Sequence, residues 1–369
     1  MKFDRRLLIN FDWTLLLLVL AISLIGLLNI YSSGLNRASS GQDYVYVRQI
    51  QWIAVGLVFM IVGFSVDYRL IGRYSYLIYA FSVLLLVVVS FYGYATRGSQ
   101  RWIVLWGFTF QPSELVKITL ILALARYFDD HRVVTPYRLR ELCIPALITL
   151  APFLLILKQP DLGTAIVLFV IFCSMTLFIG VRWKSLAGAA IAGLVLIPLG
   201  WFFLKDYQKE RIVTFFNPDS DPLGAGYHVI QSIIAVGSGG LFGKGFLQGT
   251  QTQLRFLPER HTDFIFSVFA EEWGFLGGIF LLLLFMALMM WGLKIALHSR
   301  DFSGTMISVG ITSLIFWEVF VNIGMVLGIL PVVGIPLPFL SYGGSSMVIL
   351  MLGIGLLMNV SMRRFILQP

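Results

Sequence analysis

Long apolar runs, repeated along almost the whole chain, constrain the fold more than any other feature of this sequence. Each run approaches the roughly 20 residues that a helix needs to cross a bilayer. The chain of 369 residues is 58% hydrophobic and only 12% charged, whereas a soluble domain carries about 25% charged residues. Strands of a membrane β-barrel would alternate apolar and polar residues, and these runs do not. The sequence therefore predicts an all-α polytopic membrane protein.

The spacing of the apolar runs predicts a single domain over residues 1–369, built as a bundle of ten transmembrane helices. One long hydrophilic segment, at about 205–264, interrupts the runs and is predicted to be a loop outside the membrane. The expected spans are 13–31, 50–66, 73–94, 111–127, 142–158, 164–181, 185–204, 265–296, 304–329 and 340–362.

The distribution of basic residues predicts the orientation of the bundle. With the N-terminus placed inside, most of the 27 Lys and Arg residues fall in inner segments, as expected for cytoplasmic loops. The short outer segments hold only Arg37, Arg48, Arg97, Arg101 and Lys158. Both termini are thus predicted to be cytoplasmic and the 205–264 loop external. The net charge of +8 is attributed to this topology and to contact with anionic membrane lipid, not to nucleic acid.

The long loop contains an apolar stretch at 229–236 and a glycine-rich stretch at 237–249. The first is too short to span a bilayer, so it is expected to lie in the interface or to re-enter beside the bundle. The glycines could let backbone amides approach a phosphate, or could form tight turns against neighbouring helices. Their spacing favours turns, and no nucleotide-binding motif is present.

Charged residues at the ends of the predicted spans are candidates for function, because charge inside a membrane is costly. Glu114 and Lys117 lie three residues apart, so they share a helix face and can pair. This pair is either a structural ion pair inside the bundle or part of a site. Asp161 can cap the following helix, and Arg101 can act as an anchor at the outer surface.

The segment PERHTDF, at 258–264, is the most informative of the polar groups. It ends the long loop and places Asp263 at the start of a hydrophobic helix, close to Arg260 and His261. Asp263 is the best candidate for a general base. The alternative is a helix cap with a salt bridge, although three charged neighbours exceed what a cap requires. Two turns deeper, Glu271 and Glu272 are expected to line a cavity or to pair with basic groups.

A proline-rich segment at 330–346 breaks the helix before the last span. It ends in a small polar turn that contains Ser341 and Tyr342. This turn is either a simple helix breaker or a re-entrant turn that contacts a substrate. Glu318, in the middle of the ninth span, can hydrogen-bond across the bundle and is left without a role. Asn322 lies one turn away on the same face.

Taken together, these residues predict an outward-facing polar site, centred on a carboxylate, at one end of a helical bundle. No His/Cys metal set and no spacing that supports a Ser-His-Asp arrangement is seen in the sequence. The pattern is compatible with an enzyme that acts on a lipid-linked substrate and equally with a transporter.

The chain resembles the SEDS family, whose members act in cell shape, elongation, division and sporulation, over nearly its whole length. It is more similar to the elongation members than to the division or sporulation members. The motifs that carry the resemblance are RW at 101–102, QPSELVK at 111–117, QPDLGT at 159–164, GSGGLFGKGF at 237–246, PERHTDFIFSVFAEEWG at 258–274 and GILPVVGIPLPFLSYGGSS at 328–346.

The resemblance implies a peptidoglycan glycosyltransferase that polymerises lipid II on the outer face of the bacterial cytoplasmic (inner) membrane. Its partners would be lipid II, the growing glycan strand, a class B penicillin-binding protein and other membrane proteins of the elongation complex. In this family Asp263 matches an essential loop aspartate, and Glu114 and Lys117 match a charged pair. Asp161 and Arg101 match further functionally important positions.

The mechanism that the resemblance implies uses Asp263 as the base and a cation to receive the pyrophosphate leaving group. Arg101, Lys117 or Arg260 could supply that charge. No obligatory cofactor is evident, and a divalent cation, Mg²⁺ or Mn²⁺, could assist. His261, Ser341 and Tyr342 are expected to support the site or contact the substrate. The alternatives are a lipid II flippase and a non-catalytic activator of the penicillin-binding protein.

Overall fold

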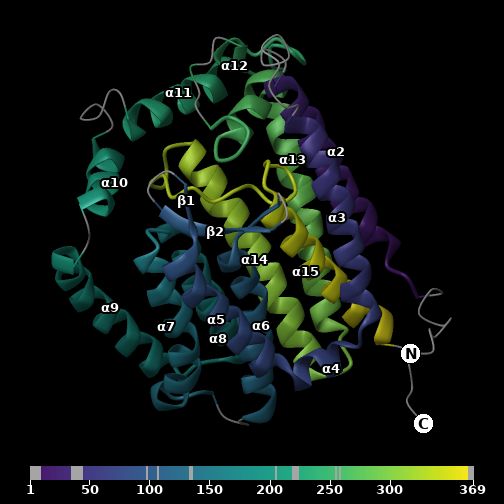
Figure 1. Cartoon of the computed structure of the whole chain (residues 1–369), viewed down its shortest axis with the longest axis vertical. Helices are drawn as coiled ribbons and strands as arrows, with labels where there is room; N and C mark the ends of the chain where they lie inside the picture. Colours follow the sequence, from purple (N-terminus) through teal and green to yellow (C-terminus); the bar gives the residue numbers. More distant parts are fainter. Residues whose placement is uncertain are drawn as a thin grey trace.

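The structure is a computed structural model, and it describes residues 10–34, 45–96, 99–105, 108–132, 136–203, 206–217, 224–253, 256 and 259–364. Within these residues it is a helical bundle (Figure 1), which confirms the predicted fold class. The long helices coincide with the predicted spans. They are α2 (Trp13–Gly34), α3 (Val45–Ser65), α5 (Ser75–Tyr92), α6 (Pro112–Asp130), α7 (Cys143–Lys158), α8 (Leu162–Ile179), α9 (Trp183–Phe203), α13 (Ile265–Leu297), α14 (Phe302–Val326) and α15 (Gly344–Arg363).

The described residues contain eight helical stretches that are long and apolar enough to cross a membrane. The other two predicted spans are α6, which carries several charges, and α9, whose apolar part is the shorter stretch Trp183–Val195. The chain is therefore a polytopic membrane protein. The count of ten membrane crossings is approximate.

Helix α6 lies inside the bundle, packed against α5, α7, α8 and α14. Nearly all of its side chains are buried, including the charged Glu114 and Lys117 in its first two turns. Pro112 occupies the first turn, where its missing amide hydrogen costs nothing. Because the neighbouring helices shield α6 from lipid, its polar residues can lie at membrane depth.

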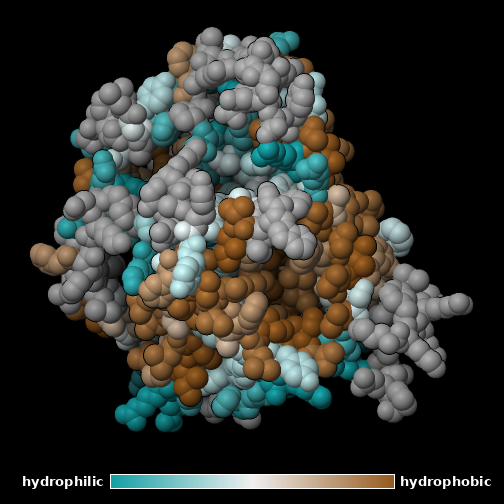
Figure 2. All heavy atoms as spheres, viewed as in Figure 1, coloured by the Kyte–Doolittle hydropathy of each residue, from teal (hydrophilic) through white to brown (hydrophobic). Residues whose placement is uncertain are grey.

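The outer surface of the bundle has the composition expected of a lipid-facing surface. Figure 2 shows a broad hydrophobic band across this face of the molecule, with hydrophilic residues below and above it. Large apolar side chains on α5 and α7 are exposed, among them Leu77, Phe81, Leu147 and Leu154. Such exposure would be a liability in water but is favourable in a bilayer.

A small antiparallel sheet joins α5 to α6, which the all-α prediction did not include. Its strands are β1 (Tyr94–Thr96), β2 (Ser99–Leu105) and β3 (Phe108–Phe110), in the order β1-β2-β3. The pairing of β2 with β3 is in register from Ile103 opposite Phe110 to Leu105 opposite Phe108. The sheet carries Arg101 and Trp102 to the end of the bundle where α6 begins.

The predicted loop at 205–264 forms short helices at the upper end of the bundle in Figure 1. These are α10 (Asp206–Phe216), α11 (Ala225–Ser238) and α12 (Thr250–Gln253). Residues 205, 218–223, 254–255 and 257–258 of this loop lie outside the described residues. Helix α11, which contains the apolar stretch 229–236, packs against α13 and α14. Ser232 Oγ donates a hydrogen bond to the Val326 carbonyl at 2.8 Å.

The glycine-rich segment forms tight turns against α13, as its spacing predicted. Helix α13 is broken at Gly274, which adopts φ 66° and ψ −166°. The glycine-rich segment replaces the backbone hydrogen bonds that the break removes. Phe275 N donates to the Gly240 carbonyl at 2.8 Å, and Gly245 N donates to the Glu272 carbonyl at 3.0 Å. The break therefore separates an upper half-helix, Ile265–Trp273, from the lower part of α13.

A methyl group at Gly243 is expected to destabilise this contact. A Cβ atom there would lie 2.1 Å from the Glu272 carbonyl oxygen, and the residue has φ +81°. The left-handed conformation alone costs an L-residue about 1–2 kcal/mol, so Gly243→Ala should clearly lower the thermal unfolding midpoint in detergent. Gly237→Ala is the control, because nothing lies within 4 Å of its Cβ position. Equal midpoints for the two variants would contradict this explanation.

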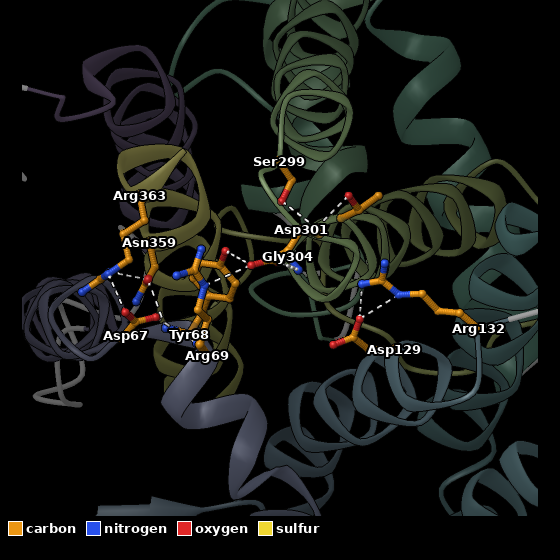
Figure 3. A network of polar contacts seen from close by, with 11 residues as sticks. Asp67, Tyr68, Arg69, Asp129, Arg132, Ser299, Asp301, Gly304, Asn359 and Arg363 are labelled. Carbon is orange, nitrogen blue, oxygen red and sulfur yellow. Dashed lines mark hydrogen bonds and ion pairs between the residues drawn. The ribbon is translucent and has the colours of Figure 1, made fainter. Parts of the chain in front are cut away.

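At the opposite end of the bundle, α4 (Tyr68–Arg73) is held to the start of α14 by Asp301 (Figure 3). Asp301 caps α14 by accepting a hydrogen bond from Gly304 N at 2.8 Å. It also accepts from Tyr68 Oη at 2.7 Å and from Arg69 Nε at 3.0 Å. Burial and the neighbouring Asp301 raise the pKa of Tyr68. The phenol therefore stays protonated and remains a donor to Asp301.

Asn359 joins the end of α3 to α15 at this same end (Figure 3). Its side-chain amide is fully buried and donates to the carbonyls of Gly63, at 2.8 Å, and Val66. Its oxygen accepts from Arg363, whose Nη1 also donates to the Phe64 carbonyl at 3.1 Å. A single buried asparagine thus satisfies carbonyls that the end of α3 leaves free.

Candidate active site

A cavity of about 640 Å³ lies at the end of the bundle where the 205–264 loop is found. Segments from six parts of the chain line it, and charged residues are frequent among them. The lining residues that carry charge are Arg101, Glu114, Lys117, Asp161, Arg211, Glu259, Asp263 and Glu318. Tyr342 and the backbone around Gly334 and Gly343 complete the wall. The cavity therefore brings together most of the residues that the sequence singled out.

Lys117 lies between two carboxylates deep in this cavity. Its Nζ is 2.7 Å from Glu114 Oε2 and 2.5 Å from Glu318 Oε1. The exposed fractions of the three side chains are 2%, 5% and 0%. The predicted pairing of Glu114 with Lys117 is confirmed. Glu318, which was left without a role in the sequence analysis, hydrogen-bonds across the bundle as expected and supplies a second negative charge.

Asp161 caps α8, as its position in the sequence predicted. It accepts hydrogen bonds from Thr164 N at 3.2 Å and from Thr164 Oγ1 at 3.0 Å. Arg101 Nη1 lies 3.8 Å from Asp161 Oδ2, and Arg101 Nε donates to the Gln159 carbonyl at 2.8 Å. Arg101 also donates to the Pro160 carbonyl. With 25% of its side chain exposed, Arg101 is a cation that a ligand in the cavity can reach.

Asp263 belongs to a turn that precedes α13, and its half-buried side chain lines the cavity. The N-cap of α13 is Phe264, which makes no side-chain cap hydrogen bond. Asp263 is therefore not the helix cap that the alternative interpretation proposed. Gly334 lies beside this carboxylate, since a Cβ atom at Gly334 would be 3.5 Å from Asp263 Oδ2. Asn322 Nδ2 donates to the Asp263 carbonyl at 3.0 Å.

Arg260 and His261, which precede Asp263, are buried and are not among the lining residues of the cavity. His261 Nδ1 lies 2.7 Å from Ser33 Oγ on α2. The His261 carbonyl accepts a hydrogen bond from Tyr342 N at 2.8 Å. These contacts tie the Asp263 turn to α2 on one side and to the segment before α15 on the other. A supporting function for the two residues stays a prediction.

Ser341 is also buried outside the cavity lining, and it joins two loops. Its Oγ donates to the Thr262 carbonyl at 2.7 Å and accepts from Leu337 N at 2.8 Å. Tyr342, the next residue, does line the cavity. The proline-rich segment thus packs on the Asp263 turn, and Tyr342 and the following glycines line the cavity.

Glu271 and Glu272, on the upper half-helix of α13, lie away from the cavity lining. Glu271 Oε1 is 2.7 Å from Lys244 Nζ, which confirms the expected pairing with a basic group. Glu272 instead accepts a hydrogen bond from Ser32 Oγ on α2. The two carboxylates therefore fasten the half-helix to the glycine-rich segment and to α2.

Arg211 is the charged lining residue that the sequence did not single out. It comes from α10, within the long hydrophilic loop, where charged residues are ordinary and the pattern gave no reason to choose one. Glu318 carried a signal, because a carboxylate in the middle of an apolar span needs a partner. That signal did not identify Lys117 as the partner of Glu318.

Comparison with known proteins shows the family to which this chain belongs. Residues 12–365 match the sequence model of the FtsW/RodA/SpoVE family, described as a cell cycle protein. The peptidoglycan glycosyltransferase MrdB of Escherichia coli K12 is 45% identical over 367 residues, which cover 98% of this chain and 96% of that protein. A chain from a peptidoglycan synthase complex superposes with a TM-score of 0.82 at 35% identity, over 96% of this chain and 98% of that one.

The crystal structure of the rod shape determining protein RodA of Thermus thermophilus is also similar, with a TM-score of 0.72 at 31% identity over 96% of this chain and 98% of that one. The chain belongs to the FtsW/RodA/SpoVE family, the SEDS family that the motifs predicted. The names of the relatives confirm the predicted enzyme class, a glycosyltransferase.

Proposed function

We propose that this chain polymerises lipid II into glycan strands, with Asp263 as the general base. One observation carries the proposal: the cavity places Asp263 together with Arg101, Lys117 and Arg211 at one end of a membrane-embedded bundle. A base and several cations within one cavity suit a reaction in which a hydroxyl displaces a pyrophosphate. The relatives named peptidoglycan glycosyltransferases support the same reaction.

In this reaction the 4-hydroxyl of the acceptor N-acetylglucosamine attacks the anomeric carbon of the donor N-acetylmuramic acid. Asp263 takes the hydroxyl proton as the new glycosidic bond forms. The bond between the anomeric carbon and the pyrophosphate oxygen breaks, and undecaprenyl pyrophosphate leaves with the bonding electrons. Pyrophosphate is a good leaving group, so the step needs no protonating acid. One essential carboxylate is therefore sufficient, unlike the carboxylate pair of most glycosidases.

Of Arg101 and Lys117, Arg101 is better placed to receive the leaving pyrophosphate. Lys117 is almost fully buried between Glu114 and Glu318, so two carboxylates already offset its charge. Arg101 is more exposed. Its Nη1 lies 3.8 Å from Asp161 Oδ2, the carboxylate with which it pairs among the described residues. A guanidinium also presents several donors in a plane that matches phosphate oxygens.

The described part of the chain shows no ready-made site for a divalent cation. Within the described residues, no group of three or more His, Cys, Asp or Glu side chains could hold a metal ion. Stabilisation of the leaving group is assigned to Arg101.

The location and partners follow from the same proposal. The distribution of Lys and Arg supports a bacterial inner-membrane protein with cytoplasmic termini and with the cavity on the external face. A structural neighbour that belongs to a peptidoglycan synthase complex supports a class B penicillin-binding protein as partner. Other membrane proteins of the elongation machinery are proposed to join it.

The test is glycan formation by the purified protein from labelled lipid II in detergent, alone and with its cognate class B penicillin-binding protein. An enzyme forms polymer in detergent micelles, where no compartments exist. A flippase forms none there, because it needs two leaflets and only moves its substrate. A non-catalytic activator also forms none, yet its Asp263→Asn variant would still support rod shape in cells. Absence of polymer under all conditions would refute the proposed function.

A further inference from the structure

The backbone of the Asp263 turn has little regular structure to hold it in place. Residues 259–263 form turns, and α13 begins only at Ile265. A carboxylate that must meet a sugar hydroxyl needs a position fixed within a fraction of an ångström. Contacts from other parts of the chain must therefore supply the rigidity that the turn itself lacks.

Asn322 makes a contact with residue 263 itself. Its Nδ2 donates one hydrogen bond to the Asp263 carbonyl at 3.0 Å and another to the Ile335 carbonyl at 2.7 Å. The side chain is fully buried, and Asn322 is not among the residues that line the cavity. It therefore has no direct access to a substrate, and its two donors are both used on backbone carbonyls.

The two carbonyls belong to two different segments that line the cavity. Asp263 lies in the turn 259–263, and Gly334 and Ile335 lie in the segment 333–336. Gly334 adopts φ +74°, and its Cβ position would be 3.5 Å from Asp263 Oδ2. By holding both carbonyls, the single amide of Asn322 fixes the Asp263 turn against the 333–336 segment.

Asn322 also lies on the same helix as a member of the buried charge cluster formed by Glu114, Lys117 and Glu318. It lies four residues after Glu318 on α14, so the two share a helix face. Glu318 is fixed by its 2.5 Å contact with Lys117. One face of α14 thus positions both the buried charge cluster and the turn that carries Asp263.

We propose that Asn322 is a positioning residue for the reaction: it holds the Asp263 turn against the 333–336 segment, so that the carboxylate faces the acceptor hydroxyl. This inference rests on the proposed function. In this role Asn322 affects turnover although it does not itself contact the substrate. Loss of the amide should leave substrate binding intact and misplace the base.

Asn359 provides a matched control at the other end of the bundle. It is also fully buried and also donates from one amide to two backbone carbonyls, those of Gly63 and Val66. Replacing either asparagine by leucine removes two donated hydrogen bonds and keeps a similar side-chain volume. Asn359→Leu also removes the bonds that its oxygen accepts from Tyr68 N, at 3.2 Å, and from Arg363. A purely structural effect should therefore be at least as large in Asn359→Leu as in Asn322→Leu.

The experiment compares wild type, Asn322→Leu, Asn359→Leu and Asp263→Asn, each as full-length protein with its penicillin-binding protein partner. Glycan formation from labelled lipid II gives kcat and KM. The rate is divided by the concentration of protein that binds a fluorescent lipid II analogue, so that unfolded protein does not count. We expect Asn322→Leu to lower kcat about 10²-fold, with KM within about threefold of wild type. Asn359→Leu should keep the wild-type kcat per binding site.

Equal kcat losses in the two leucine variants would overturn the proposal, and so would wild-type turnover of Asn322→Leu. If Asn322→Leu binds no analogue, Asn322→Ala is measured in the same way. Failure of both to bind would make Asn322 a folding determinant and would also overturn it. An active Asp263→Asn would instead refute the proposed base. An inactive Asp263→Asn with a fully active Asn322→Leu leaves the proposed function standing and removes only the inference.

Discussion

Asp263→Asn is expected to lower the rate of glycan formation by about 10²–10⁴-fold, the usual contribution of a positioned general base. The amide is nearly isosteric with the carboxylate but cannot accept the proton of the acceptor hydroxyl. The N-cap position of α13 is Phe264 and not Asp263, so the substitution leaves the N-cap residue unchanged. The unfolding midpoint should therefore stay close to that of wild type. The measurement is polymer length and yield from labelled lipid II, at equal concentrations of folded protein.

Asp129→Asn is the control for this prediction. Asp129 forms an ion pair with Arg132 near the far end of α6, and the exposed fractions of the two side chains are 23% and 56%. Exposed pairs contribute about 0–1 kcal/mol to stability, so the control should retain full activity. Wild-type glycan synthesis by Asp263→Asn would exclude this carboxylate as the base. A similar loss in both variants would show that the assay responds to charge rather than to position.

Lys117→Met is expected to be the most destabilising single substitution in the cavity. It leaves Glu114 and Glu318 buried without the ammonium that lies 2.7 Å from one and 2.5 Å from the other. Removing one partner of a buried ion pair typically costs about 3–5 kcal/mol, because the remaining charge is uncompensated. The thermal unfolding midpoint in detergent and the yield of monodisperse protein are the measurements.

The companion variant combines Lys117→Met with Glu114→Gln and Glu318→Gln. It removes the uncompensated charge while keeping similar side-chain volumes, so most of the lost stability should return. Both variants should lack normal activity, which separates the contribution of the cluster to stability from its contribution to the site. A Lys117→Met protein as stable as wild type would contradict the description of this cluster.

The fold was predictable to the extent that lipid exposure leaves a pattern in the sequence. Apolar runs located every long helix, because the bilayer requires about 20 apolar residues for each crossing. Helix α6 shows where that pattern weakens, since its charged residues are shielded by neighbouring helices. The short β-sheet before it left no comparable signal. Its strands are three to seven residues long and depend on local pairing.

The candidate site was predictable residue by residue but not as an arrangement. Motifs and the cost of membrane charge selected Asp263, Asp161 and Lys117, which the cavity brings together. Spacing along one helix predicted the partner of Lys117 at position 114. It did not predict the partner at position 318, which lies 201 residues further along the chain. Pairing between distant helices depends on tertiary packing, about which a single sequence says little.

The burial of α6 has a consequence for biogenesis. Translocon-insertion scales assign about +2.5 to +3.5 kcal/mol to a charged residue at the centre of a lone helix, so α6 is a poor candidate for independent insertion. Pairing of Glu114 with Lys117 offsets part of that cost within the helix itself. Glu318, on α14, is synthesised much later, and it is a single carboxylate that pairs with Lys117 of the earlier helix. Membrane integration of this protein is therefore expected to be completed in stages, with the polar helix secured only after the C-terminal half has been synthesised.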